Sequence, residues 1–310
     1  VQIRPPQPKF SHMNKNYKCN VCELNQSKII DYFPNLIFRY MKFFIYFFKI
    51  NFFIKILFRN LYLTKFPDGE ELFLNKKIIL CSNCKLGTTY PMIDEKTLNN
   101  YYRKNYWLNH RNIKSNMIHD NEKLNFKKKI DFIKDKIDIK MDYVFAEFGC
   151  GKGTLASIAI ENISIKKYFG IELSTVSLTN DLLKNNKFSQ VESIEQIKDG
   201  SIDIFIMIQS IEHLVDINSF FKKLNYKLKK NSLLLIETPN YNEYYFKNKK
   251  SGWVPHTLFF NKSSLLYLSE KFKFEVVDFQ FMDGTWAELG LNSKDVENED
   301  HNMRILLRKN

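Results

Sequence analysis

The sequence predicts an α/β protein with a doubly wound, Rossmann-like sheet of seven mostly parallel strands and a small N-terminal module built around cysteines. Three observations lead to this fold class. Short apolar runs alternate with helix-like segments from about residue 93 onward. The first of these runs leads directly into a glycine-rich loop, and two Cys-x-x-Cys pairs precede the alternating region.

The first 12 residues, VQIRPPQPKFSH, are rich in proline and read as an expression tag ahead of Met13. The chain carries a formal charge of +13, of which residues 13–92 supply +7 and residues 93–310 supply +4. A nearly balanced main region makes nucleic acid an unlikely partner. Five cysteines in 310 residues exclude a disulfide-dense secreted scaffold. The sequence holds no uncharged run of about 18 residues, so we expect no transmembrane span and a cytoplasmic location.

The two cysteine pairs are Cys19-Asn-Val-Cys22 and Cys81-Ser-Asn-Cys84. Each pair places two thiolates on one tight knuckle, and two knuckles complete a tetrahedral four-sulfur site for Zn²⁺. The alternative is four reduced, buried and inert cysteines. The 58 residues between the pairs exceed what a compact zinc ribbon needs, which predicts a module over 13–92 that contains an insertion.

The insertion is centred on residues 34–62, where Lys and Arg recur among dense Phe and Ile. The spacing of the basic residues predicts one polar stripe on an otherwise apolar helix. We favour a helix or helical hairpin packed against the main domain or a partner subunit, as in a homodimer. A second interpretation is an interfacial helix lying peripherally on the anionic inner face of a membrane. Nucleic-acid binding is the least favoured, because so much Phe and Ile suits packing better than base stacking.

Residues 93–310 then read as alternating helices and strands. Each predicted strand is a short apolar run, as buried parallel strands require, and helices connect consecutive strands. The predicted helices are 122–136, 153–163, 175–185, 216–229 and 262–271. The predicted strands are 143–148, 167–171, 189–192, 203–208, 232–237, 274–281 and 303–308.

The glycine loop follows the first strand as Glu147-Phe-Gly149-Cys-Gly151-Lys-Gly153-Thr. Glycines allow the backbone to turn sharply there and to approach a ligand without a Cβ. A dinucleotide fingerprint would require glycine at 154, where threonine stands. Glu172 ends the next strand, and a carboxylate at that position can accept both hydroxyls of a ribose.

This loop resembles motif I of the class I S-adenosylmethionine-dependent methyltransferases, and further motifs follow in order over residues 93–310. Asp199-Gly-Ser-Ile-Asp, Ser210-Ile-Glu-His213, Glu237-Thr-Pro-Asn and Trp253-Val-Pro-His256 resemble family stretches. The cysteine pairs fit a bacterial subgroup that carries a zinc ribbon before the methyltransferase domain. Several members of that subgroup methylate sugars or related precursors of cell-surface polysaccharides and antibiotics.

The resemblance implies an S-adenosylmethionine site at the carboxyl edge of the sheet. The three loop glycines would line the methionine half, Glu147 would hold the ammonium group, and Glu172 would bind the ribose. The remaining implied contacts are Gln209 at the methionine moiety, Glu192 or Ser193 at the adenine, and Tyr101, Tyr102 and Tyr106 closing over the cofactor. For these tyrosines, simple core packing is an equally good interpretation.

Methyl transfer from a sulfonium requires an aligned acceptor and often a general base. His256 and His213 both lie near the carboxyl edge of the predicted sheet and are the candidates for that base. A structural, helix-capping role is the alternative for His213. Related sugar C-methyltransferases carry Tyr and Glu where this chain has Trp253 and Pro255, so O- or N-methylation gains support.

The sequence therefore predicts an O- or N-methyltransferase for a small molecule, such as a nucleotide-linked or phosphorylated sugar used for capsule or O-antigen. An alternative is an rRNA methyltransferase whose basic zinc module binds RNA. A third interpretation, from another class, is a membrane-associated scaffold with an inactive methyltransferase domain. The acceptor, its reacting atom, the identity of the base and the oligomeric state stay open at this level.

Overall fold

The protein is described here from a computed structural model. It describes residues 17–24, 27–30, 72, 76–103, 120–138, 142–174, 178–241, 256–282 and 302–310. Several predictions fall outside these residues. They are the tag at 1–12, the insertion at 34–62, Tyr106, Trp253 and Pro255.

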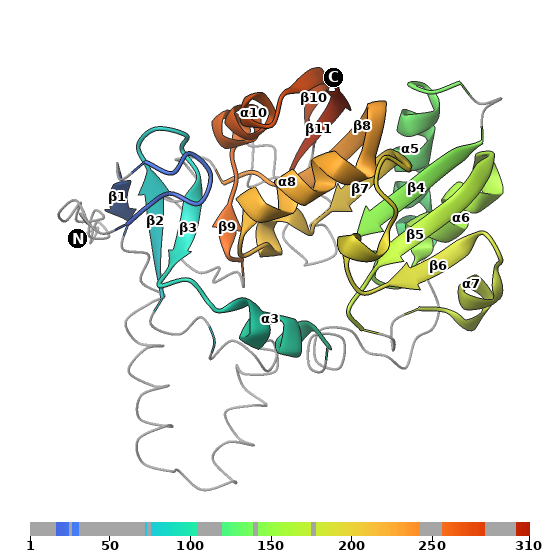
Figure 1. The fold of residues 1–310 in the computed structure, drawn as a ribbon, viewed down its shortest axis with the longest axis horizontal. Coiled ribbons are helices and arrows are strands. Elements are labelled where there is room, and N and C mark those ends of the chain that lie inside the picture. The colour runs from blue at the N-terminus through green and yellow to red at the C-terminus, as the bar shows by residue number, and fades with distance from the viewer. Residues whose placement is uncertain are drawn as a thin grey trace, which may run out of the picture.

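A seven-stranded sheet forms the main body and confirms the predicted fold class (Figure 1). Its strand order is β10-β11-β8-β7-β4-β5-β6. The strands are β4 (Tyr143–Phe148), β5 (Ile165–Ile171), β6 (Phe188–Val191), β7 (Ile202–Ile208), β8 (Leu228–Pro239), β10 (Phe274–Met282) and β11 (Asn302–Lys309). Strands β4 to β8 are parallel, whereas β11 runs antiparallel to both of its neighbours. The order reverses between β4 and β7, and in such sheets ligands bind at the carboxyl ends beside that switch point.

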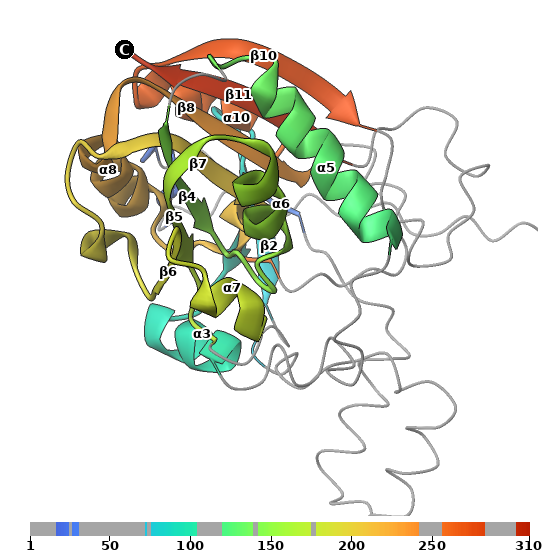
Figure 2. The ribbon, with the colours of Figure 1, turned by 90° about the vertical axis from the view of Figure 1, so that its right-hand side faces the viewer.

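Helices cover both faces of this sheet. Figure 2 shows α5 and α6 on one face and α8 on the other. The helices are α3 (Glu95–Tyr101), α5 (Asp120–Lys134), α6 (Thr154–Asn162), α7 (Asn180–Lys184), α8 (Ile217–Lys227) and α10 (Lys262–Lys271), with short 3₁₀ turns η4 (Ile194–Gln196) and η5 (Ile211–His213). Most begin where the sequence supplies a capping side chain: Asp216 accepts a hydrogen bond from the amide of Ser219 at the start of α8.

The large sheet has a hydrophobic core on each face, because successive side chains along its buried strands point to opposite faces. On β7, Ile204 and Ile206 pack with residues of α5 and α6, whereas Phe205 and Met207 pack with residues of α8 and α10. Successive side chains of a strand point to opposite faces, so an entirely apolar run serves both cores. None of the helices in the described ranges combines the length and hydropathy needed to span a bilayer.

A second, four-stranded sheet joins the cysteine segment to the main body. Its order is β1-β2-β3-β9, all antiparallel, with β1 at Ser27–Ile30, β2 at Lys77–Cys81, β3 at Gly87–Tyr90 and β9 at Leu258–Phe259. Strand β9 comes from the segment that follows the large sheet's β8. Tyr17 and Val21 share one apolar core with Phe221 of α8 and Leu265 of α10. The cysteine segment is therefore packed onto the α8 side of the large sheet.

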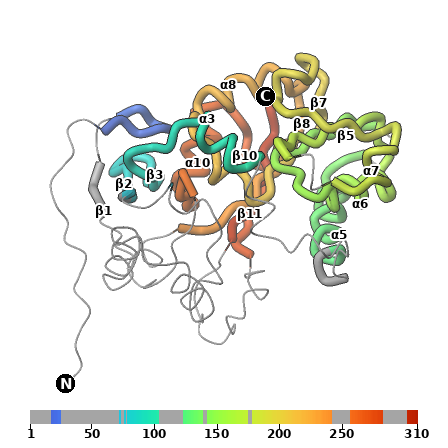
Figure 3. Tube along the Cα trace, turned by 90° about the horizontal axis from the view of Figure 1, so that it is seen from below, coloured from blue at the N-terminus to red at the C-terminus, as the bar shows by residue number. Residues whose placement is uncertain are grey.

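Helix α3 leaves the four-stranded sheet and runs toward the larger one (Figure 3). Asp94 caps its first turn by accepting a hydrogen bond from the Thr97 amide. The residues just beyond it contact the segments that follow β6 and β7. Helix α3, called the lead-in helix below, thus lies over the carboxyl edge of the parallel strands.

Candidate functional site

The glycine loop between β4 and α6 has the backbone that its sequence demands. Gly149, Gly151 and Gly153 all have positive φ angles, of 72°, 55° and 73°. A Cβ at Gly149 would lie 3.0 Å from the Ser210 Cβ, and one at Gly153 would lie 2.1 Å from a Leu182 methyl group. The loop can therefore adopt this turn only with glycines, and it lies directly beside the segment that leads into η5.

Glu172 is fixed at the end of β5, next to this loop. Its two carboxylate oxygens accept hydrogen bonds from the Gly151 amide and the Ser174 amide, each at 3.0 Å. The side chain of Gln190 donates to the Glu172 carbonyl at 3.0 Å. A carboxylate held by two backbone amides at this edge is oriented in advance for ribose hydroxyls.

Glu147 lies one strand away, at the end of β4, and is buried. The Tyr168 hydroxyl donates to its carboxylate at 2.7 Å. Burial raises the pKa of Glu147 to about 8, although the hydrogen bond from Tyr168 acts in the opposite direction. Glu147 precedes the glycine loop by two residues, and its contact with the cofactor's ammonium group stays a prediction.

The predicted residues at other strand ends occupy the same edge. Gln209 follows β7 with a φ of 49°, an uncommon value for a residue with a side chain. Its side-chain amide donates to the side-chain oxygen of Asn302 at 3.1 Å. Glu192 follows β6 and is exposed, and Arg103 donates to both of its oxygens at 3.2 and 2.7 Å. Ser193 precedes η4, and its amide donates to the Gln196 side chain.

The tyrosines at the end of α3 differ from one another. Tyr101 is buried, and the Tyr102 hydroxyl lies 2.6 Å from Nδ1 of His213. Together with the Arg103–Glu192 ion pair, this contact ties the lead-in helix to two strand ends. The segment after α3 thus bridges the edge of the sheet, and a closing role of Tyr102 over the cofactor stays a prediction.

His213 and His256, predicted separately, are brought together. Their rings are perpendicular with centroids 4.7 Å apart. The Tyr241 hydroxyl lies 2.6 Å from Nδ1 of His256, which is buried. Burial lowers the pKa of His256 well below its usual range, and the neighbouring His213 lowers it further. The imidazole of His256 is therefore neutral at physiological pH.

Glu212 is a third member of this cluster that the site prediction did not include. It is fully buried, and the Thr238 hydroxyl donates to its Oε2 at 2.9 Å. Burial raises its pKa to about 7. A ligating atom of each of Glu212, His213 and His256 lies within 4.8 Å of those of the others. The Glu-His pair in the sequence was the available signal, because an acidic residue beside a histidine at a strand end favours a shared site.

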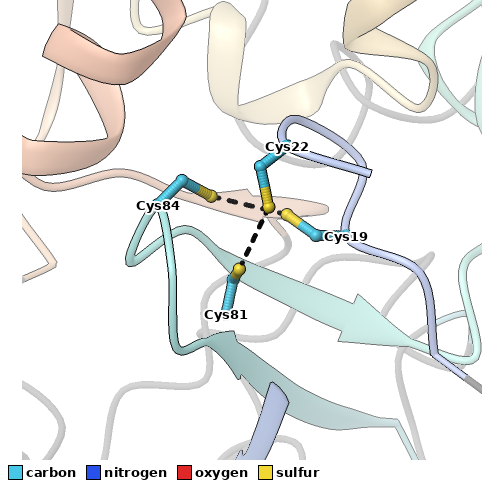
Figure 4. A group of neighbouring side chains, drawn as sticks. All are labelled: Cys19, Cys22, Cys81 and Cys84. Atoms are coloured by element: carbon cyan, nitrogen blue, oxygen red, sulfur yellow. Dashed lines mark hydrogen bonds between the residues drawn. The ribbon is translucent and has the colours of Figure 1, made fainter. Parts of the chain in front are cut away.

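The cysteines form a separate cluster at the ends of two matching knuckles (Figure 4). In each knuckle the first cysteine amide donates to the residue five positions on, and the residue after the second cysteine has a φ near 60°. The four sulfurs lie within 4.8 Å of one another, and two pairs are 3.4 Å apart. Four thiolates at metal–sulfur distances of about 2.3 Å stand about 3.8 Å apart, so this donor set fits one tetrahedral metal.

S-Adenosylmethionine fits the carboxyl edge of the large sheet, away from the cysteine cluster. The glycine turn packs closely against Ser210 and Leu182, as only residues without a Cβ allow, and Glu172 is anchored beside it. The loop would hold the methionine half and Glu172 the ribose. The cofactor, when bound, supplies a sulfonium methyl group with a good leaving group.

Comparison with solved structures finds class I methyltransferases at low sequence identity. An S-adenosylmethionine-dependent methyltransferase from Mesorhizobium loti has 11% identity and a TM-score of 0.47, covering 58% of this chain and 96% of its own. A similar protein from Listeria monocytogenes has 13% identity and a TM-score of 0.48, covering 60% and 99%. Geranyl diphosphate C-methyltransferase from Streptomyces coelicolor has 13% identity and a TM-score of 0.48, covering 62% and 85%.

Comparison with curated proteins finds no match. A family model described as a methyltransferase domain matches residues 99–278, which is more than half of the chain and includes the glycine loop, Glu172 and both histidines. The chain belongs to this methyltransferase family and is a class I S-adenosylmethionine-dependent methyltransferase.

Proposed function

We propose that this enzyme transfers a methyl group to an oxygen or nitrogen of a small polar acceptor, such as a nucleotide-linked or phosphorylated sugar of a surface polysaccharide. The observation that carries the proposal is the paired arrangement of His213 and His256. His213 ends η5, and Ser210, which leads into η5, lies beside Gly149 of the glycine loop. Each ring is held by a tyrosine hydroxyl at 2.6 Å, so the pair is positioned before any acceptor binds.

The histidine pair suits a hydroxyl or amine acceptor. When the acceptor atom forms its bond to the methyl carbon, the carbon–sulfur bond breaks and the acceptor must lose a proton. His256 is neutral because it is buried, and His213 is half-buried and so is reachable from the solvent side. We assign removal of the acceptor proton to this pair.

The cysteine cluster supports Zn²⁺ as a structural metal. Its sulfurs have the spacing of a closed four-thiolate site, which leaves no position for a substrate. The knuckles contact the methyltransferase segment: Lys85 accepts a hydrogen bond from Asn261 at 2.7 Å through its carbonyl. We assign the module a scaffolding role beside the acceptor side of the enzyme. It also resembles the zinc ribbon of the bacterial subgroup in which several members methylate sugars or related precursors.

The proposal is tested in two steps. Calorimetry should show that the purified chain binds S-adenosylhomocysteine, and turnover should then be measured with sugar nucleotides, phosphorylated sugars and an rRNA fragment. We expect methylation of a sugar substrate and a loss of at least about 100-fold in kcat for His213→Ala, with S-adenosylhomocysteine binding retained. Turnover on the rRNA fragment alone, or an unchanged kcat for His213→Ala, would refute the proposal.

A further inference from the structure

The cluster of Glu212, His213 and His256 has the composition of a metal site distinct from the cysteine cluster. Two imidazoles and one carboxylate bind Zn²⁺, Fe²⁺, Co²⁺ and related divalent cations in proteins, with open positions left for a substrate. The atoms that would ligate the cation already lie within 4.8 Å of one another. At bond lengths of about 2.1 Å, tetrahedral ligand atoms stand about 3.4 Å apart, so small side-chain rotations close the site.

The carboxylate provides an independent indication. Glu212 is 0% exposed, and its Oε1 has no hydrogen-bond partner among the described residues. No Lys or Arg of the described residues forms an ion pair with it; Lys129 and Arg304 pair instead with another buried glutamate, Glu237. A buried carboxylate oxygen without a partner is costly, and a bound cation would satisfy both the oxygen and its charge.

The histidines are oriented as metal ligands commonly are. Nδ1 of His213 meets the Tyr102 hydroxyl, and Nδ1 of His256 meets the Tyr241 hydroxyl, both at 2.6 Å. Such contacts hold each ring in place through Nδ1, so that Nε2 is the nitrogen that coordination would use, with Nδ1–H donating to the tyrosine oxygen. The Thr238 hydroxyl orients the carboxylate in the same way.

We propose that Glu212, His213 and His256 bind a divalent cation that holds the acceptor oxygen or nitrogen beside the S-adenosylmethionine methyl group. The inference rests on the proposed function and refines the role of the histidine pair: as ligands of the cation they promote loss of the acceptor proton through the cation, and the proton passes to solvent on the half-buried side of the cluster. A cation bound to a hydroxyl lowers the pKa of that hydroxyl and fixes its position at the same time. His213 lies on the half-buried side of the cluster, where an acceptor can reach the open positions.

The test is a Co²⁺ titration of the full chain with its cysteine site already loaded with Zn²⁺. Ligand-field absorption in the visible range reports a nitrogen- and oxygen-ligated cation, whereas thiolate charge-transfer absorption would reveal exchange at the cysteines. We expect one saturable site without thiolate bands, and at least a tenfold weaker affinity in both Glu212→Gln and His213→Asn. Glu195→Gln changes an exposed carboxylate on η4 and should bind Co²⁺ like the wild type.

His213→Asn keeps the test decisive if Glu212→Gln fails to fold, because His213 is less buried. Circular dichroism and S-adenosylhomocysteine binding establish that each variant is folded. Absence of a saturable Co²⁺ site in the folded wild type, or equal affinity in the His213 variant, overturns the inference. Neither result depends on turnover, so the proposed methyltransferase reaction can stand or fall separately.

Discussion

Thr89 of the cysteine module donates a hydrogen bond through its hydroxyl to the backbone carbonyl of His256, at a distance of 2.7 Å. The amide of Thr89 also donates to the Thr257 carbonyl at 2.9 Å. The Thr257 hydroxyl in turn lies 2.9 Å from the Glu212 carbonyl and 2.7 Å from the Leu214 carbonyl. The four-stranded sheet thereby positions the backbone that presents both histidines.

Thr89→Val should expose this connection. The change keeps the shape of the side chain but removes a buried donor, which typically costs about 1–3 kcal/mol. We expect a lower free energy of unfolding and a fall in kcat larger than any change in S-adenosylhomocysteine affinity. Urea denaturation, turnover and calorimetry provide these three values.

Ser232→Ala is the matched control for Thr89→Val. It also deletes a buried hydroxyl, but one without a hydrogen-bond partner among the described residues. Its kcat should equal that of the wild type. An equal loss in both variants would mean that the Thr89 hydroxyl has no particular role in placing His256.

Metal analysis tests the cysteine cluster. We expect one thiolate-bound Zn²⁺ per chain, lost in Cys81→Ser, and a lower melting temperature after chelation. The reason is that the cysteines belong to the same apolar core as α8 and α10, so an open knuckle disturbs the main body as well. Cys150→Ala changes the one cysteine outside the cluster and should leave the zinc content unchanged. A full zinc content in Cys81→Ser would contradict the assignment.

Glu172→Gln should weaken S-adenosylhomocysteine binding by about 10- to 100-fold. Charge-assisted hydrogen bonds from the Gly151 and Ser174 amides are each worth about 1.5–3 kcal/mol, and a neutral amide orients both the loop and the ribose less well. Calorimetry measures the affinity directly. Glu161→Gln, which changes an exposed carboxylate on α6, serves as the comparison. Equal affinities for the two variants would exclude Glu172 from the cofactor site.

The stability of the apo protein should fall as the pH rises from 4.5 to about 8 because of Glu147. Over that window the unfolded chain has lost the carboxyl proton, whereas the folded chain still holds it, so the free energy of unfolding decreases with pH. Glu147→Gln keeps an oxygen that accepts the Tyr168 hydrogen bond. It should flatten this part of the curve, and the gain at the alkaline end should reach a few kcal/mol.

Urea denaturation at a series of pH values, without cofactor, gives both curves. Glu212 adds a similar slope between 4.5 and about 7, which the Glu147 variant should retain. Parallel curves for the wild type and Glu147→Gln would show that Glu147 does not carry a raised pKa.

Sequence pattern was sufficient for most strands and helices of the large sheet, since short apolar strands and capped helices are local signals. The helix predicted over 175–185 is described only from Asn180 to Lys184, where Thr179 caps it. Strand β8 begins at Leu228, inside the range predicted for the preceding helix. Strand β9 has only two residues, too few to show any periodicity in the sequence. It pairs with β3, which is distant in the sequence.

Candidate site residues were predictable from the sequence where they directly follow a strand, as Glu172 does. The contacts that shape the histidine pair were not, because their partners are distant in sequence: Thr89 and His256 are separated by 167 positions, and Tyr102 and His213 by 111. No local pattern encodes such contacts. They arise from the way β9 closes the small sheet and α3 crosses the edge of the large one.

A comparison of Gly153→Ala with Gly200→Ala separates the cost of backbone strain from the cost of a steric clash in the glycine loop. Both glycines have positive φ angles, of 73° and 59°, so each alanine should pay about 1–2 kcal/mol for the left-handed conformation. A Cβ at Gly200 would meet nothing within 4 Å, whereas one at Gly153 would lie 2.1 Å from Leu182. Only Gly153→Ala must therefore also move α7 or the loop, and it should lose S-adenosylhomocysteine binding as well as further stability. Urea denaturation and calorimetry on both variants provide the comparison, and equal losses in the two would show that the loop has room for a side chain.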